Sequence, residues 1–164
     1  MENGNAKAFD QFAGFYDRGE QGMQQDEAKA NELWLRAGEL GCAEGYYKLG
    51  NAYYNGSGVD IDKGKAKYYW ELAAMNGDIM ARRNLGCAEG EAANFHRAMK
   101  HFILSARAGD KDSLDEVKQG FVMGIVTKEE YANTLRTYQQ RHDEMKSDDR
   151  DEAQCWKEAR AKLS

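Results

Sequence analysis

The chain contains no proline and only three cysteines among its 164 residues. The absence of proline excludes a collagen-like or proline-rich segment and removes the strongest breaker of helices. Cys42, Cys87 and Cys155 form no CxxC pair, and their odd number leaves at least one thiol unpaired. A disulfide scaffold of the secreted kind is therefore not expected, and a reducing, cytoplasmic location is predicted.

Long apolar runs and an excess of positive charge are also missing. No stretch approaches the roughly 18–20 apolar residues that span a bilayer, and the first residues do not resemble a signal peptide. The formal net charge is −5, so neither nucleic acid nor a membrane is expected as a partner. Mean hydropathy is low, at −0.85. Nine Tyr, six Phe and three Trp nevertheless argue against disorder and favour a thin core spread over many helices.

A tandem repeat of about 36 residues runs through the chain. The residues that recur at this interval are of unlike types: Gly22 and Gly58, Asp26 and Asp62, Ala30 and Ala66, Trp34 and Trp70, and Leu49-Gly50 and Leu85-Gly86. Gly41 recurs as Gly77 and, after a shorter interval of 32 residues, as Gly109. One register held across so many residue types indicates a repeat protein with one shortened copy.

The best copy, residues 45–77, predicts two antiparallel helices. Gly45, Leu49 and Tyr53 share one helical face, and Asp62 is placed to cap a second helix that carries Trp70 and ends at Gly77. Glycines at positions 45 and 50 are expected to let a neighbouring helix approach closely. Cys42 and Cys87 are expected to be buried in the core. The aromatic stripe and its partners on the facing helices are also expected there. The stripe consists of Trp34, Tyr69, Trp70 and Phe102, and its partners are Leu49, Tyr53 and Leu85.

The predicted fold is all-α, an α-solenoid of about four antiparallel helix pairs in a short right-handed superhelix. The array is expected over residues 1–142, with copies near 6–41, 42–77, 78–109 and 110–142. The first copy opens with an apolar face that includes Phe12, and the fourth has a capping box at Thr127 and Glu130. Residues 143–164 are expected to form a charged helical cap or a frayed tail.

The third copy has lost four residues of its hairpin. Gly86 and Ala98 are 12 positions apart, whereas Gly50 and Ala66 are 16 apart. The loss, placed at residues 90–93, is expected to remove the plug that Val59 supplies in the second copy. A change of twist between the second and fourth helix pairs is predicted from it.

These motifs resemble the Sel-1-like repeat, a relative of the tetratricopeptide repeat with a longer hairpin loop. The pattern is A-x-x-x-L-G-x-x-Y-x-x-G-x-G-V followed by D-x-x-K-A-x-x-x-W-x-x-A-A-x-x-G-D, with Gly45 in place of the usual Ala. The shortened copy resembles an algal subgroup whose repeats often follow a RING-type zinc domain, although no zinc-ligand spacing exists here. The resemblance implies a protein-interaction scaffold or adaptor without catalysis.

No catalytic, cofactor or metal site is predicted from the residue pattern. His96 and His101 are five positions apart, which turns them to different sides of a helix and disfavours a shared zinc ion. The loop glycines lack the G-K-[ST] that a phosphate loop needs. His101 is instead expected at a half-buried helix position.

A protein or peptide partner is expected on the concave surface that the first helix of each pair lines in tetratricopeptide-like arrays. The groove-facing positions of the second copy, together with the equivalent positions of the third and fourth copies, give these candidates: Glu44, Tyr47, Asn51, Tyr54, Met80, Arg83, Cys87, Asp112 and Asp115. A monomer is favoured. Two alternatives stay open: a structural self-assembly module, and a secreted repeat protein with weak small-molecule binding like a disulfide-bearing bacterial branch of the family.

Overall fold

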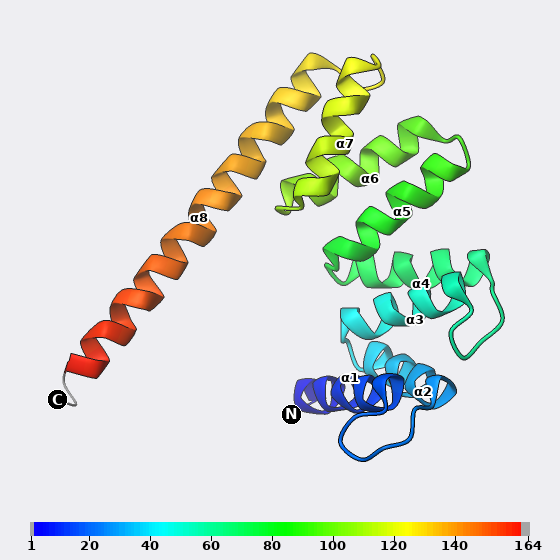
Figure 1. Cartoon of the computed structure of the whole chain (residues 1–164). Coiled ribbons are helices and arrows are strands. Elements are labelled where there is room, and N and C mark those ends of the chain that lie inside the picture. Colours follow the sequence, from blue (N-terminus) through cyan, green and yellow to red (C-terminus); the bar gives the residue numbers. More distant parts are fainter. Residues whose placement is uncertain (1, 162–164) are drawn as a thin grey trace. The chain divides into compact units, whose positions relative to one another are not determined.

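The computed structural model describes the backbone of residues 2–161 and the side chains of residues 5–148 and 152. Within that range the backbone forms eight helices and no strand (Figure 1), so the predicted all-α class is confirmed. In chain order the helices are α1 (Glu2–Arg18), α2 (Glu27–Glu39), α3 (Ala43–Asn55), α4 (Lys63–Met75), α5 (Ile79–Glu91), α6 (Phe95–Arg107), α7 (Lys111–Val122) and α8 (Lys128–Ala161).

The helices pack in the order of the sequence. Residues 1–101 form one compact unit, in which α1 contacts α2, α2 contacts α3, α3 contacts α4 and α4 contacts α5. Residues 102–164 form a second unit, in which α7 contacts α8. Packing between neighbours in sequence is the hallmark of an α-solenoid, in which each repeat buries its apolar face against the next.

The recurring aspartates and glycines begin and end the helices. Asp62 accepts a hydrogen bond from the Lys65 backbone N–H and caps α4, as its spacing predicts. Gly41, Gly77 and Gly109 each follow a second helix, with φ angles of +92°, +91° and +107°. Only glycine adopts this left-handed conformation without strain, which explains why it returns at the end of these three helices.

The core is thin, and among the described residues it consists mainly of alanines around a few larger side chains such as Trp34 and Trp70. One buried cluster joins Trp34 with Ala13, Ala30 and Leu49, and the next joins Trp70 with a set of alanines and Leu85. Trp34, Trp70 and Phe102 are buried, as predicted, whereas Tyr69 is only half-buried. Close helix approach depends on small residues, because a Cβ on Gly50 would lie 2.5 Å from Trp70 and one on Gly45 would lie 2.6 Å from the Trp34 carbonyl.

Three predictions about burial are wrong. Phe12 is 49% exposed, because its ring meets Phe15 edge to face on α1 and joins neither core cluster. Cys42 is half-buried and Cys87 is exposed, so neither is a core residue. Val59 is half-buried and belongs to neither core cluster, because the loop turns a different part of its backbone toward the preceding repeat.

The long and the short hairpin close in the same way. The connection between α3 and α4 spans residues 56–62, whereas the one between α5 and α6 spans only residues 92–94. In each, the last loop residue donates its backbone N–H to a carbonyl near the end of the first helix: Asp62 to Tyr53 at 2.9 Å, and Asn94 to Glu89 at 2.8 Å. The missing residues are therefore lost from the loop tip, while Gly90 and Glu91 remain helical.

The fourth pair begins its second helix as predicted. The Thr127 backbone N–H donates to Glu130 Oε2 at 2.9 Å, and the Glu130 backbone N–H donates to Thr127 Oγ1 at 3.2 Å, which is a capping box. Phe121 of α7 stacks on Tyr131 of α8 with ring centroids 5.1 Å apart. The backbone of α8 is helical through Ala161, while Cys155 lies outside the residues with described side chains.

Candidate interaction surface

A hollow of about 300 Å³ lies between α3 and α5, the first helices of the second and third pairs. Asn51 and Tyr54 line it from α3, and Asn84 and Cys87 line it from α5. The indole of Trp70, from α4, forms part of its wall. The repeat thus brings polar side chains of two first helices around the edge of a core tryptophan.

Asn51 organises the polar part of this hollow. Its Oδ1 atom accepts hydrogen bonds from Trp70 Nε1 and from Asn84 Nδ2, each at 3.0 Å. Within the part of the chain that the structure describes, Asn51 Nδ2 and Asn84 Oδ1 have no hydrogen-bond partner. One amide donor and one amide acceptor are therefore fixed in orientation and available to a ligand, which matches the pair of groups that a peptide bond presents.

Tyr54 forms a rigid side of the same hollow. Its hydroxyl donates to Glu91 Oε1 at 2.8 Å, and its ring lies 5.3 Å from the Trp70 ring. The hydrogen bond to the carboxylate raises the pKa of Tyr54, and the same bond, followed by Lys63, lowers the pKa of Glu91. The Tyr54 ring thus loses little side-chain entropy when a partner packs on it.

A second hollow, of about 270 Å³, lies on the other side of Asn51. Tyr47 and Lys48 of α3 line it together with Trp34 and Asp17. The Lys48 ammonium lies 5.7 Å from the centroid of the Trp34 ring and pairs with Glu44 at 3.0 Å. Asn51 is common to both hollows, so they form one continuous surface along α3.

The structure brings together four of the nine candidates predicted from sequence. Tyr47, Asn51, Tyr54 and Cys87 line the two hollows described above. Glu44 is exposed and pairs with Lys48, while the half-buried Met80 and Arg83 line neither hollow. Asp112 and Asp115 are exposed on α7, in the second unit, and stay predictions.

Asn84 is not among the surface residues that the sequence predicts. It stands one position before Leu85-Gly86, where the second repeat has Lys48. That position is not one of the groove-facing positions predicted from the sequence. Its role depends on an amide-to-amide contact between α3 and α5 across 33 positions of sequence. No motif in the sequence announces such a pair.

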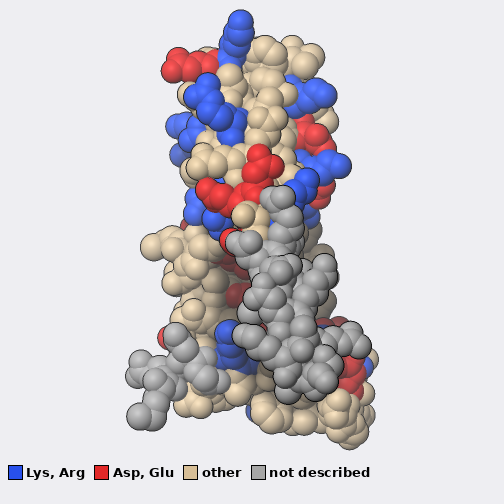
Figure 2. Space-filling view, turned by 90° about the vertical axis from the view of Figure 1, so that its left-hand side faces the viewer, with Lys and Arg blue, Asp and Glu red and all other residues tan. Residues whose placement is uncertain are grey.

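No group of three or more His, Cys, Asp or Glu side chains is arranged to hold a metal ion in the part of the chain that the structure describes. None of the described helices combines the length and apolarity needed to cross a bilayer. On the face drawn in Figure 2, basic and acidic side chains are interspersed rather than gathered into a patch of one sign.

Three features define the class of protein: helix pairs that pack in sequence order, a glycine that follows the second helix, and a buried tryptophan. Together they define an α-solenoid of short repeats. Three segments, residues 13–42, 43–78 and 79–110, match the family model of the Sel1 repeat. The chain therefore belongs to the Sel1 repeat family, and the resemblance seen in the sequence is confirmed at that level.

The chain is similar to one curated protein and to solved structures of the same fold. It is 33% identical over 101 residues to the ERAD-associated E3 ubiquitin-protein ligase component HRD3B of Arabidopsis thaliana; the match takes in 61% of this chain and 16% of that protein. A Sel1 repeat protein from Oxalobacter formigenes aligns with a TM-score of 0.68 at 22% identity, covering 82% of this chain and 58% of that one. The protective antigen c5321 of uropathogenic Escherichia coli aligns with a TM-score of 0.69 at 20% identity, covering 85% and 31%.

Proposed function

We propose that the chain is a non-catalytic scaffold or adaptor that binds a peptide or protein segment on a concave face lined by the first helices. The observation that carries the proposal is the amide pair of Asn51 and Asn84, which offers one donor and one acceptor beside the rigid Tyr54 ring. Sel1 repeats are interaction modules in general, and the curated relative is named as a ligase component. A peptide backbone suits these groups better than a charged ligand, because neither amide carries charge.

Asn51→Asp tests this proposal with little disturbance of the core. A carboxylate keeps the acceptor for Trp70 Nε1 and Asn84 Nδ2 but removes the donor that faces the hollow. Loss of one hydrogen bond corresponds to about 1–1.5 kcal/mol, or roughly a tenfold weaker complex. The measurement is a quantitative pull-down from the source organism with wild-type and variant baits, followed by titration of the proteins that the wild type enriches.

Tyr68→Ala is the matched control. Tyr68 is 55% exposed on α4 and lines neither hollow, so its removal should leave the enriched set unchanged. If the two variants lose the same proteins, or if Asn51→Asp loses none, the binding face lies elsewhere.

Self-assembly is the second candidate function, and one observation favours it. Phe12 is 49% exposed on α1 and meets Phe15 edge to face, with ring centroids 6.0 Å apart. An apolar end of a solenoid can stack on another copy. Light scattering should then show a concentration-dependent oligomer that Phe12→Ser abolishes, whereas a monomer at all concentrations supports the adaptor.

We place the protein in the cytoplasm, supported by its three cysteines, because so few and an odd number do not fit the disulfide framework of a secreted protein. Alkylation of Cys87 in intact cells, together with imaging of a fluorescent fusion, tests the location. We also propose that the chain is related to algal repeat arrays that often follow a RING-type zinc domain. The mass of the native protein, detected by an antibody, tests whether a further domain accompanies the repeats.

A further inference from the structure

The hairpin loop of the second repeat packs against the start of α2, the second helix of the first repeat. The Ser57 carbonyl accepts a hydrogen bond from Asn31 Nδ2 at 2.7 Å. A Cβ on Gly58 would lie 2.6 Å from the Glu27 carbonyl carbon and 2.7 Å from the Ala28 nitrogen, so the loop backbone lies directly against the first turn of α2. The loop therefore plugs the seam between the first two repeats with backbone, and not with Val59.

One repeat later the same positions surround an open space. The residues 36 positions after Glu27, Ala28 and Asn31 are Lys63, Gly64 and Lys67, on the first turns of α4. All three line a hollow of about 440 Å³. Because the α5–α6 connection has lost the loop tip, no backbone of the third repeat fills this space, which we name the hairpin gap.

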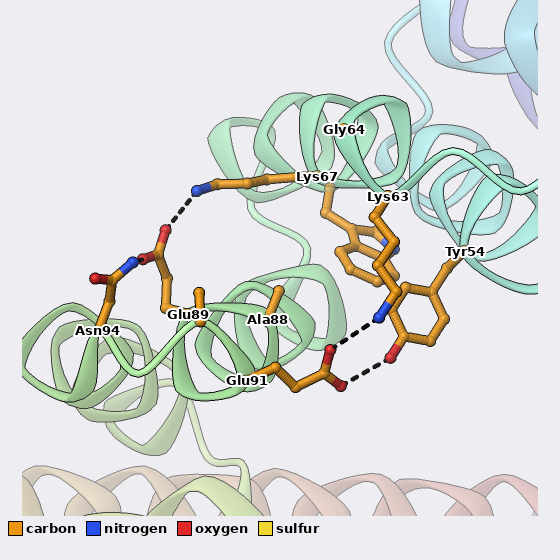
Figure 3. Close-up of a pocket in the computed structure, with 10 residues that line it drawn as sticks. Tyr54, Lys63, Gly64, Lys67, Ala88, Glu89, Glu91 and Asn94 are labelled. Atoms are coloured by element: carbon orange, nitrogen blue, oxygen red, sulfur yellow. Dashed lines mark hydrogen bonds and ion pairs between the residues drawn. The ribbon is translucent and has the colours of Figure 1, made fainter.

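Two bridges between α4 and the α5 region frame the hairpin gap, as Figure 3 shows. On one side Lys67 donates to Glu89, which also accepts from Asn94 Nδ2 at 2.9 Å. On the other side Lys63 pairs with Glu91 at 3.3 Å, beside Tyr54. Ala88 lies between the two bridges on α5 and offers only a methyl group to the gap.

The charges around the hairpin gap are already compensated. Glu89 is only 4% exposed, and the hydrogen bond from Lys67 is the main cause that lowers its pKa, so the pair is ionised. Lys63 pairs with Glu91, whose pKa is lowered first by the hydrogen bond from Tyr54 and then by Lys63. Two compensated lysines do not select a free anion, which favours a neutral occupant such as a peptide backbone.

The hairpin gap retains the features that receive a turn in the preceding seam. Within the described chain Lys67 donates to one partner, Glu89, so its remaining N–H groups can donate to a carbonyl as Asn31 does to Ser57. Gly64 replaces Ala28, and a Cβ there would meet only Asp62 Oδ1, at 3.2 Å. The first turn of α4 is therefore open to close backbone approach.

We propose that the hairpin gap is a docking site for a glycine-containing turn of a partner protein, which takes the place that Ser57-Gly58 holds one repeat earlier. The proposal rests on the scaffold function but concerns a different site. It shares a wall with the amide hollow, because Tyr54, Trp70, Ala88 and Glu91 line both. A partner bound along α3 and α5 can thus place a turn in the gap as well.

The probe is a cyclised peptide with the sequence of residues 54–62, YNGSGVDID, which contains the chain's own plug. It is titrated into the full chain labelled with nitrogen-15, and amide shifts are followed by NMR. We expect saturable shifts concentrated at Gly64, Lys67 and Ala92. Absence of shifts at millimolar peptide, or shifts confined to other helices, overturns the proposal.

A loop graft gives the matched variant. Inserting Gly-Ser-Gly-Val between Ala92 and Ala93 restores the missing length, so the chain should fill its own gap and bind the peptide at least tenfold more weakly. The same four residues inserted after Gly124, in the α7–α8 connection, should leave peptide binding unchanged. Circular dichroism checks that both chains are folded, and equal peptide binding by the two folded grafts contradicts the proposal.

Two further measurements separate this site from its alternatives. Asn51→Asp should leave binding of the cyclised peptide within twofold, so a failure of the amide hollow does not imitate a failure of the hairpin gap. If a second copy of this chain is the occupant, light scattering will show a dimer that the graft at Ala92 abolishes and the graft at Gly124 preserves. That result would replace the partner turn with self-association.

Discussion

Glycine and alanine set how closely the helices approach in this chain. Gly50 faces the Trp70 indole with no room for a side chain, and Ala66 and Ala73 are fully buried beside it. Few bulky side chains are fully buried among the described residues, and Trp34 and Trp70 pack mainly against small neighbours. Stability at this scale depends on the smallest residues as much as on the largest.

Gly50→Ala should destabilise the chain by about 1–3 kcal/mol, because the new methyl group overlaps the Trp70 ring and forces the helices apart. Urea denaturation followed by tryptophan fluorescence measures the loss. Gly90→Ala is the control, since a Cβ there would meet nothing within 4 Å apart from its own helix backbone and chain neighbours, and the position is helical. That variant should gain about 0.5–1 kcal/mol, and similar losses in both would contradict the packing argument.

His101 should make the first unit sensitive to mild acid. Burial is the main cause that lowers its pKa below 6.5; Arg82 and Lys67 add to this, and Glu89 and Glu71 oppose it. The unfolded chain therefore takes up the proton first, so stability falls as pH drops through about 6.5. His101→Leu, which copies Leu33 at the equivalent position, should reduce the difference in urea midpoint between pH 7 and pH 5. An unchanged difference would assign the acid sensitivity to other groups.

Residues that act within one repeat could be predicted, and residues that act between repeats could not. Trp70, Gly50 and Asp62 recur or stand at helical spacing, so the period itself gives their roles. Asn84 of α5 contacts α3, and Glu89 of α5 contacts α4. Their roles depend on the distance between these helices, which no local sequence pattern encodes. Exposure of Phe12 and Cys87 was missed for the same reason, because it depends on which neighbouring helix covers a face.

At the scale of elements, the starts of the helices are fixed by local hydrogen bonds that the sequence predicts. Aspartates cap α2, α4, α5 and α7 by accepting a backbone N–H three residues on. The start of α8 instead uses the reciprocal pair of Thr127 and Glu130. Element boundaries were therefore easier to predict than the contacts between elements.

Thr127→Ala should cost about 1 kcal/mol, because α8 loses the oxygen that accepts from the Glu130 N–H. Thr137→Ala is the control within the same helix. Its hydroxyl only bonds back to the Asn133 carbonyl on an exposed surface, so alanine should be neutral or slightly stabilising. Thermal unfolding by circular dichroism compares the two, and the proposed capping role fails if they melt alike.

At the scale of the whole molecule, the chain divides into two compact units, residues 1–101 and 102–164. Contacts are local in sequence within each unit, so the loss of one buried side chain should be felt mainly in its own unit. A repeat chain built this way is expected to open in parts rather than all at once.

Val117→Ala and Leu85→Ala test this division, since both side chains are almost fully buried and lie in different units. Each should cost about 1–4 kcal/mol. Hydrogen exchange should show lost protection in α7 for the first variant and in α4 and α5 for the second. Uniform loss across all helices in either variant would mean that the chain unfolds as a single cooperative body.

In each of the first three hairpins, one backbone hydrogen bond joins the last loop residue to the end of the preceding helix, whatever the length of the loop. Asp26 to Tyr16, Asp62 to Tyr53 and Asn94 to Glu89 join residues ten, nine and five positions apart, yet their N–O distances are 2.9, 2.9 and 2.8 Å. The atoms on either side of the loop stay at hydrogen-bonding distance, whatever the number of residues between them. Insertions and deletions at the loop tip therefore leave this closing hydrogen bond in place, so each of these tips is a place where a lineage can vary its surface, or an engineer can graft a foreign loop, while the loop base stays closed.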